Sequence, residues 1–335
     1  MTKLTVVDVC AGAGGLALGL EQAGFEPALL MDSWPAACDS LRLNRPKWQI
    51  SQTDLREFTL STHPQAQDID LLSAGLPRVK SSAAVSRTEW EAELLLLKAT
   101  LYLMHDLQPR ALLIENVPGL VNAPGYEPIR NFIRDELEHL GYGFGWYILN
   151  AADFGVPQDR KQGVLVALEE PYFRRFRQPE PTVREHQSVG TALGPSMAAR
   201  GWAGADHWVG QAKRIAPTLV GGSDRRGGAD LGPSGSRRAW ARMGVDGSTI
   251  ADDVPGENFV WAPELGRKGM VRITTGQAAI LQGFPPDWKF AGKKTARYRQ
   301  IGQASPPPVG KALGLAIRSA LGDSESPVAG YTSTP

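Results

Sequence analysis

The sequence has few cysteines and no long apolar run. Its 335 residues include two cysteines, Cys10 and Cys38, which cannot form a disulfide framework and lack the spacing of metal ligands. No apolar stretch approaches the length that crosses a bilayer, and the first residues have the pattern of a strand, not of a signal peptide. We therefore expect a soluble, cytoplasmic protein with no metal and no membrane partner.

The chain also lacks a net charge of either sign. Its formal net charge is +1, so no global field attracts it to nucleic acid, and any basic surface must be local. Hydrophobic residues make up 42% of the sequence, which is enough to bury a full core in one large or two modest domains. No internal repeat is visible.

A glycine-rich turn lies near the N-terminus. The β-branched run at residues 5–9 predicts a buried strand, and it is followed by Ala11-Gly-Ala-Gly-Gly15 and by a helical pattern that ends at Gly24. This arrangement presents backbone N–H groups to a nucleotide-like ligand. The spacing is not G-x-G-x-x-G, so NAD is not the first choice. The alternative is a tight turn that binds nothing.

Two acidic residues follow at successive strand ends. Asp32 ends a predicted strand at residues 28–32, where it is placed to accept ribose hydroxyls. Asp54 ends a third strand pattern, where it is placed to accept an adenine amino group. A glycine loop followed by two such acids is the arrangement of an S-adenosylmethionine site.

The first half of the chain alternates strand and helix patterns, which predicts an α/β fold with a parallel sheet and right-handed crossovers. Further strands are predicted at residues 70–75, 111–115 and 163–168, and helices at 91–107 and 127–140. After residue 179 the sequence becomes rich in Gly, Arg, Ser and Pro. We expect the late helices at 276–281 and 308–321 to pack back onto the first domain.

Several motifs resemble those of the DNA cytosine-C5 methyltransferases, in the family's order over residues 4–320. The first is Asp8-Val-Cys-Ala-Gly-Ala-Gly-Gly15. The others are Leu41-Arg-Leu-Asn-Arg-Pro46, Glu115-Asn-Val-Pro-Gly-Leu120, Phe154-Gly-Val-Pro-Gln-Asp-Arg160, Gln282-Gly-Phe-Pro-Pro-Asp-Trp288, Tyr298-Arg-Gln-Ile-Gly302 and Pro306-Pro-Pro-Val309. The resemblance implies a Rossmann-like, S-adenosylmethionine-dependent methyltransferase domain with a smaller, irregular target-recognition domain. The implied divisions are 1–179, 180–265, 266–322 (returning to the large domain) and a tail at 323–335.

The resemblance also implies a set of cofactor-binding residues. They are Asp8, Cys10, Ala11, Gly12, Gly14, Gly15, Asp32, Ser33, Asp54, Leu55, Gly75 and Pro77. Two of them depart from the family pattern. Cys10 stands at a position that is usually phenylalanine, and Ser33 stands where an apolar or aromatic residue often follows the ribose acid. Trp34 is a candidate to compensate, and we expect S-adenosyl-L-methionine to bind more weakly than in an active relative.

The segment 200–242 is locally basic. It has eight basic and three acidic residues, which leaves a net charge of about +5 in a nearly neutral protein and predicts a phosphate footprint. The segment lies where the family has its target-recognition domain, although a solvated loop is the alternative. The candidate contacts to double-stranded DNA are Arg214, Arg225, Arg226, Arg237, Arg238 and Arg242, and Trp202, Trp208 and Trp240 are expected to add flat surfaces.

The expected nucleophile is missing. Cytosine C5 is a poor nucleophile, and the resemblance implies a cysteine thiolate that adds to C6 so that C5 can attack the methyl group. In the family this cysteine follows a proline just after the fourth strand, but here Pro77 is followed by Arg78. A guanidinium cannot be deprotonated in a protein and cannot attack C6. Cys10 and Cys38 both lie in the cofactor half of the sequence and are not substitutes.

Other positions of the implied catalytic site also differ. The family motif Gln-x-Arg-x-Arg, which hydrogen-bonds the flipped base, keeps Arg160 but has Gln162 in place of its second arginine. An asparagine after the Tyr298–Gly302 motif is replaced by Gln303. Glu115, which the family uses to hydrogen-bond the cytosine ring at N3, is present, but it could equally have a structural role.

Three hypotheses follow. The first is a degenerate family member that cannot methylate C5 by the usual route. It would act by binding DNA, or as the companion of an active methyltransferase in a restriction-modification or regulatory system. The second is an active methyltransferase with a changed acceptor or mechanism, although no Asp/Asn-Pro-Pro-Tyr-like motif is present to hold an exocyclic amine. The third is a small-molecule enzyme on the same fold, against which the arginine-rich segment argues.

Overall fold

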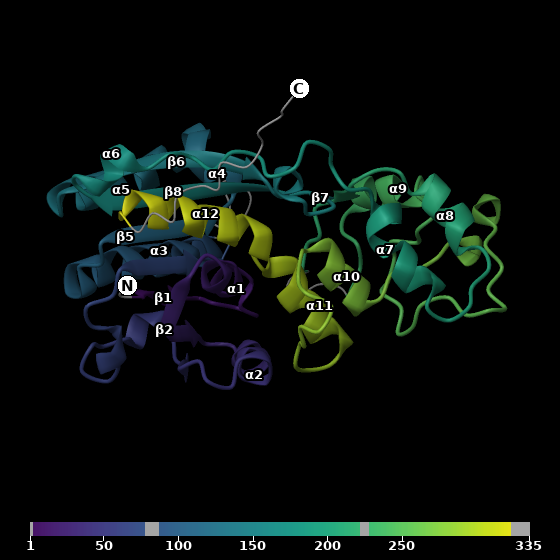
Figure 1. The fold of residues 1–335 in the computed structure, drawn as a ribbon, viewed down its shortest axis with the longest axis horizontal. Coiled ribbons are helices and arrows are strands. Elements are labelled where there is room, and N and C mark those ends of the chain that lie inside the picture. Colours follow the sequence, from purple (N-terminus) through teal and green to yellow (C-terminus); the bar gives the residue numbers. More distant parts are fainter. Residues whose placement is uncertain (1–2, 78–86, 222–227, 323–335) are drawn as a thin grey trace, which may run out of the picture.

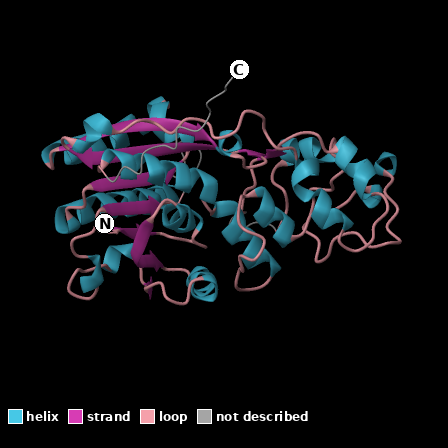
Figure 2. Cartoon of the chain, viewed as in Figure 1, coloured by secondary structure: helices cyan, strands magenta, loops and turns pink. Residues whose placement is uncertain are grey.

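The computed structural model describes residues 3–77, 87–221 and 228–322, the side chains of 87–93 excepted. The predictions for Arg78, Arg225 and Arg226 therefore lie outside the described residues. The molecule is elongated, with a sheet and its helices at one end and short helices and loops at the other (Figures 1 and 2). Within the described ranges, the helices are all too short or too polar to span a membrane.

The large sheet has seven strands in the order β3-β2-β1-β4-β5-β8-β6. Their bounds are β1 Leu4–Val9, β2 Phe25–Asp32, β3 Ile50–Gln52, β4 Leu71–Gly75, β5 Ala111–Asn116, β6 Tyr142–Asn150 and β8 Lys161–Glu169. The first five strands pair in parallel, as predicted, but β8 is antiparallel to both β5 and β6. The prediction of a wholly parallel sheet was therefore wrong, and β6 was missed. The connection from β6 to β8 has no crossover helix, so the chain returns in the opposite direction.

Helices cover both faces of this sheet (Figure 1). They are α1 Gly15–Gln22, α2 Pro35–Asn44, α3 Arg87–Leu107, α4 Pro118–Asn122, α5 Glu127–His139, α6 Tyr172–Arg175 and α12 Pro307–Ala320, with 3₁₀ turns η1 Leu55–Glu57, η2 Pro64–Ala66, η3 Pro124–Tyr126 and η4 Ala151–Phe154. Alternate strand residues separate the two cores. Val7 and Leu72 pack in the core of α3 and α5, whereas Val6 and Leu71 pack in the core of α1 and α12.

The smaller part has its own apolar core. It contains α7 Val189–Ala198, α8 Ala205–Gln211, α9 Ser234–Ala241, η5 Pro263–Gly269, α10 Thr275–Leu281, α11 Lys294–Gln303 and the two-stranded pair of β7 Gln158–Asp159 with β9 Ala216–Pro217. The three tryptophans expected to offer flat surfaces belong to this core, because Trp202 is 3% exposed and Trp208 and Trp240 are 0% exposed. That prediction was wrong. A segment with few aliphatic residues fills its interior with large rings instead.

The two late helices do not pack alike. We expected both to return to the large sheet. Helix α12 does so and packs closely along α1, whereas α10 packs mainly against α7 and α11 and belongs to the second core. The glycine turn is nevertheless linked to that core, because Trp288 of the second core donates its indole N–H to the carbonyl of Ala13 at 3.1 Å.

We predict that Gly19→Ala destabilises the protein. A Cβ at this position of α1 would lie 2.4 Å from the carbonyl oxygen of Pro307 and 2.6 Å from the amide nitrogen of Lys311. These are backbone atoms of α12 that cannot rotate away, so α1 and α12 must move apart. The expected loss in unfolding free energy is about 1–3 kcal/mol, measured by urea denaturation. Gly210→Ala in α8 is the control, because a Cβ there meets nothing within 4 Å. The control should be as stable as wild type or more stable, because alanine has the higher helix propensity. Stability changes that are equal at the two positions would contradict the close packing of α1 on α12.

Candidate active site

The glycine turn joins β1 to α1 in a conformation that side chains resist. Gly12 and Gly14 have φ of +55° and +84°, and the amide of Gly14 donates to the carbonyl of Ala11 at 2.9 Å. A Cβ on Gly14 would lie 2.5 Å from Leu41, whereas a Cβ on Gly12 would meet nothing within 4 Å. The turn is therefore packed on one side at Gly14 and open at Gly12, where a ligand can approach the backbone.

Asp32 closes this turn from the end of β2. Its carboxylate accepts the amide N–H of Gly12 at 2.8 Å and that of Trp34 at 2.7 Å. Burial raises the pKa of Asp32, while these two hydrogen bonds lower it. Ser33 is exposed beside it. The structure thus brings Asp32 and Gly12 together, and the carboxylate of Asp32 orders the glycine turn.

Asp54 lies at the end of the neighbouring strand and is already engaged. Its carboxylate accepts the backbone N–H and the Nε–H of Arg56, both at 2.9 Å. These contacts lower the pKa of Asp54 to about 2. Leu55 is buried in the first core. An adenine amino group would therefore share this carboxylate with Arg56.

Asp8 lies beneath the turn, and the structure does not place it against a ligand. It is completely buried on β1, and its carboxylate accepts the hydroxyl of Ser73 on β4. Cys10 follows with a φ of +52° and packs against the first core. The backbone of Gly75 lies close to the carbonyl of Cys10, and the carbonyl of Pro77 accepts the side-chain amide of Asn116 at 3.2 Å. The ends of β1, β4 and β5 are therefore joined at one edge of the sheet.

The buried carboxyl of Asp8 predicts a pH-dependent stability. Burial raises its pKa from 3.8 to about 7, so between these values the folded protein keeps a proton that the unfolded chain has lost. The contribution of Asp8 to stability is therefore highest below pH 4 and is lost as the pH rises toward 7, a change on the order of 4 kcal/mol. We expect Asp8→Asn to remove this loss, because asparagine does not titrate. The free energy of unfolding of the variant, measured by urea denaturation, should therefore rise relative to that of wild type from pH 5 to pH 8.

The matched comparison is Asp54→Asn, because the pKa of Asp54 is shifted in the opposite direction. The stabilising effect of Asp54 is present above pH 4 and disappears as the pH falls toward 2. Equal pH profiles for wild type and Asp8→Asn would contradict the assignment of a proton to buried Asp8.

A cavity of about 410 Å³ opens at the end of β5, between the large sheet and the smaller part. Its polar and apolar lining includes Glu115, Asn116, Asp159, Lys161, Thr218 and Val220. Glu115 is only 8% exposed and pairs in register with Gly75. Among the predicted catalytic residues that the structure describes, Glu115 therefore lines a cavity, and the volume of this cavity is sufficient for a small ring. Lys161 and Thr218 were missed, although Lys161 lies inside the Gln-x-Arg-x-Arg motif and Thr218 in the basic segment 200–242.

Arg160 and Gln162 point into the interior instead. The guanidinium of Arg160 donates to the carbonyls of Leu219 and Gly302 at 3.0 and 3.1 Å. The amide of Gln162 donates to the hydroxyl of Ser305 at 2.9 Å. Neither residue lines the cavity. Arg160 instead fixes the wall of the cavity through the carbonyl of Leu219, and Gln162 joins β8 to the segment before α12. Gln303 is exposed.

The described arginines of the basic segment differ in exposure. Arg214, Arg238 and Arg242 are exposed, whereas Arg237 is half-buried and donates its Nε–H to the carbonyl of Gly232 at 2.9 Å. Arg237 is therefore partly used to fix the start of α9. The other three have the accessibility that a phosphate contact requires.

The comparison with known proteins decides the family. Residues 4–319 match the family model for C-5 cytosine-specific DNA methylase. The chain belongs to this family. Type II methyltransferase M.NaeI from Lentzea aerocolonigenes is 42% identical over 324 residues, which cover 96% of this chain and 76% of that protein. Type II methyltransferase M.NgoMIV from Neisseria gonorrhoeae is 39% identical over 324 residues, which cover 95% of this chain and 98% of that protein.

Solved structures show the same fold at low sequence identity. The crystal structure of the S. pombe Dnmt2 methyltransferase matches with a TM-score of 0.64 and 18% identity, covering 96% of this chain and 100% of that one. The predicted α/β methyltransferase fold is thereby confirmed, and the resemblance noted in the motifs is confirmed as family membership.

S-adenosyl-L-methionine is the methyl donor of this DNA methylase family. The residues present fit such a group in two respects. The open side of Gly12 gives a ligand access to the backbone, and the carboxylate of Asp32 lies beside it. When bound, the cofactor supplies an electrophilic methyl group. The roles of the individual cofactor residues remain predictions.

Proposed function

We propose that this DNA methylase homologue binds duplex DNA and S-adenosylmethionine but does not methylate cytosine C5 through a cysteine thiolate. The observation that supports the proposal is the sequence Pro77-Arg78, in which arginine stands where the family motif has its nucleophile. Arginine stays protonated in proteins and has no lone pair to add to C6.

The two cysteines of the chain are unsuited to replace that nucleophile. Burial raises the pKa of the Cys38 thiol to about 11, and Cys38 is fully buried, with its Sγ 3.3 Å from the carbonyl of Asp32. Burial also raises the pKa of Cys10 far above its usual range. Because the thiolate is the reactive form, both groups are inert near neutral pH. Neither lines the cavity beside Glu115.

DNA recognition is then the function that remains. The exposed arginines of the smaller part can contact phosphates, and the cavity beside Glu115 can receive a base. Such a protein would act as a recognition subunit or partner of an active methyltransferase in a restriction-modification system. Its affinity for duplex DNA should fall steeply with salt, because each phosphate contact releases counterions.

The second candidate is an active methyltransferase with a changed acceptor or mechanism. The names of the two relatives, both Type II methyltransferases, favour this alternative. An exocyclic amine can accept a methyl group without covalent activation of a ring. Methyl label at a nucleic-acid position other than C5 would support this function.

One experiment separates the candidates. Purified protein is incubated with labelled S-adenosylmethionine and duplex DNA, and both methyl transfer and filter retention of the DNA are measured. Retention without label supports the proposed function. Label at cytosine C5 contradicts it, and label elsewhere supports the second candidate. An absence of both retention and label would contradict DNA recognition.

A further inference from the structure

The sequence from 289 to 299 is a second basic segment, outside the arginine-rich region. Five of its eleven residues are basic and none is acidic, in a chain whose net charge is +1. They are Lys289, Lys293, Lys294, Arg297 and Arg299. Lys294 pairs with Asp252 at 2.9 Å, and the guanidinium of Arg299 lies over the ring of Trp34. Lys289, Lys293 and Arg297 are exposed and make no ion pair within the described ranges.

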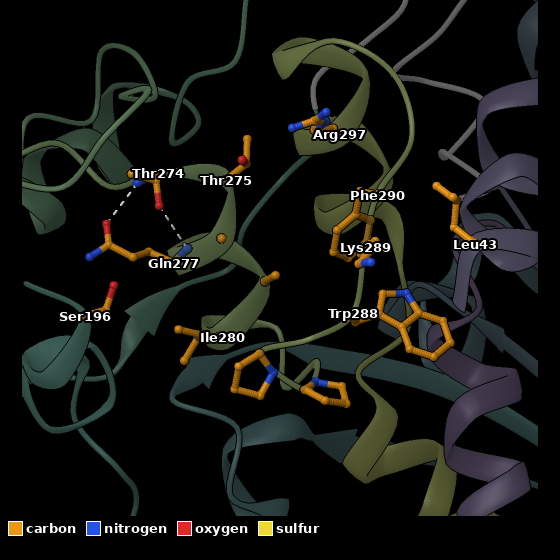
Figure 3. A pocket seen from close by; sticks show the side chains of 14 residues that line it. Leu43, Ser196, Thr274, Thr275, Gln277, Ile280, Trp288, Lys289, Phe290 and Arg297 are labelled. Carbon is orange, nitrogen blue, oxygen red and sulfur yellow. Dashed lines mark hydrogen bonds between the residues drawn. The ribbon is translucent and has the colours of Figure 1, made fainter. Parts of the chain in front are cut away.

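A cavity of about 470 Å³ lies beside this segment, between the end of α2, helix α7, helix α10 and the start of α11 (Figure 3). Lys289 and Arg297 contribute its two cations, and Ser196, Thr274 and Thr275 contribute hydroxyl groups. Among the described residues, no carboxylate lines it. Its volume is in the range of small-ligand sites, and its polar groups are all suited to donate hydrogen bonds to an anion.

Hydrogen bonds hold the guanidinium of Arg297 and the backbone of Lys289. Arg297 donates its Nε–H to the carbonyl of Gly292 at 2.7 Å, which fixes the guanidinium and leaves its Nη groups for a ligand. In Figure 3 its side chain points toward the side of the cavity on which Thr275 lies. The backbone of Lys289 is clamped by Asn44, which accepts its N–H at 2.8 Å and donates to its carbonyl at 2.7 Å. The side chain of Arg297 therefore needs little ordering when an anion binds, whereas that of Lys289 still has to be ordered.

Helix stability does not explain this charge. Lys293 precedes α11, and Lys294 and Arg297 lie in its first turn, which has no acidic residue and no side-chain cap. Cations at this end of a helix oppose the macrodipole and are unfavourable. The basic residues thus lie at the end of the helix where positive charge is unfavourable. This placement points to an anionic ligand that neutralises their charge.

We propose that this cavity is a phosphate-binding site, separate from the cavity beside Glu115, and that it takes a phosphodiester group of the bound DNA backbone. The assignment to DNA rests on the proposed function. Lys289 and Arg297 supply charge, with Arg297 able to bind two phosphate oxygens, and the hydroxyl of Thr275, on the side to which Arg297 points in Figure 3, adds a further donor.

The test compares the full-length wild type with Lys289→Gln/Arg297→Gln. The control is Lys311→Gln, an exposed lysine of α12 that lines neither cavity. We expect the double variant to bind duplex DNA about tenfold more weakly near 0.1 M salt and to reduce the slope of log affinity against log salt by about 1–2. The control should match wild type. The melting temperature of the double variant should be unchanged or higher, because unfavourable charge near the helix start is removed.

A second arm uses inorganic phosphate alone and follows its effect on the melting temperature. If wild type binds DNA and the double variant binds it with the same affinity and salt slope as the control, the proposed site is overturned while the proposed function stands. If wild type binds no DNA, the proposed function fails. In that case, phosphate stabilisation that the double variant lacks supports a free phosphate ligand, and no stabilisation overturns the site as well.

Discussion

Arg78→Cys is expected to form a covalent complex with duplex DNA that contains 5-fluorocytosine, which the wild-type protein does not form. A thiolate at this position can add to C6, and C5 can then take the methyl group. The reaction includes S-adenosylmethionine as the methyl donor. After methyl transfer C5 carries fluorine in place of the proton whose loss would expel the thiolate, so the adduct persists and labelled DNA migrates with the protein under denaturing conditions. On ordinary DNA the restored nucleophile should raise the rate of C5 methylation by at least about tenfold, which equals about 1.4 kcal/mol of activation free energy.

The matched control for this experiment is Arg78→Ser. Serine also removes the guanidinium, but its hydroxyl does not ionise near neutral pH, so it should give no adduct. Methylation by the serine variant at the same rate as the cysteine variant would show that the arginine blocks a route without a thiolate. A cysteine variant that binds DNA and cofactor but forms no adduct would mean that other departures, such as Gln162 and Gln303, are sufficient for inactivity.

Trp240→Ala is expected to lower the free energy of unfolding by about 3–5 kcal/mol. Trp240 is completely buried in the second core, so removal of its ring leaves a cavity in that core. Urea denaturation followed by circular dichroism measures the change. The loss is large because the indole is the largest apolar side chain and the surrounding core can collapse only partly into the space it leaves.

The neighbouring Arg238→Gln is the control for the tryptophan, since Arg238 is exposed on the same helix α9. It should leave the unfolding midpoint unchanged and weaken DNA binding. If Trp240 instead offered a stacking surface to DNA, its alanine variant would keep its stability and lose affinity. That result would contradict the burial of the ring.

Short-range patterns determined the first half of the fold and one edge of the candidate site. The strand at β1, the glycine turn and helix α1 follow each other within about twenty residues, and Asp32 ends the next strand, so propensity and turn chemistry place them together. The order of the family motifs was equally visible, and so was the arginine at position 78. These features depend on residue identity and local spacing.

Contacts between distant segments decided the rest. Whether Trp240 is a surface or a core, whether Arg160 lines a cavity or fixes its wall, and whether Asp8 meets a ligand depend on which elements pack against them. The cavity beside Glu115 joins residues from β5, β7, β8 and the region after β9. The sequence by itself determined the family, the glycine turn after β1 and the arginine at position 78. The tertiary structure decided burial, the direction of β8 and the two cavities, because these arise from long-range packing that a local pattern does not encode.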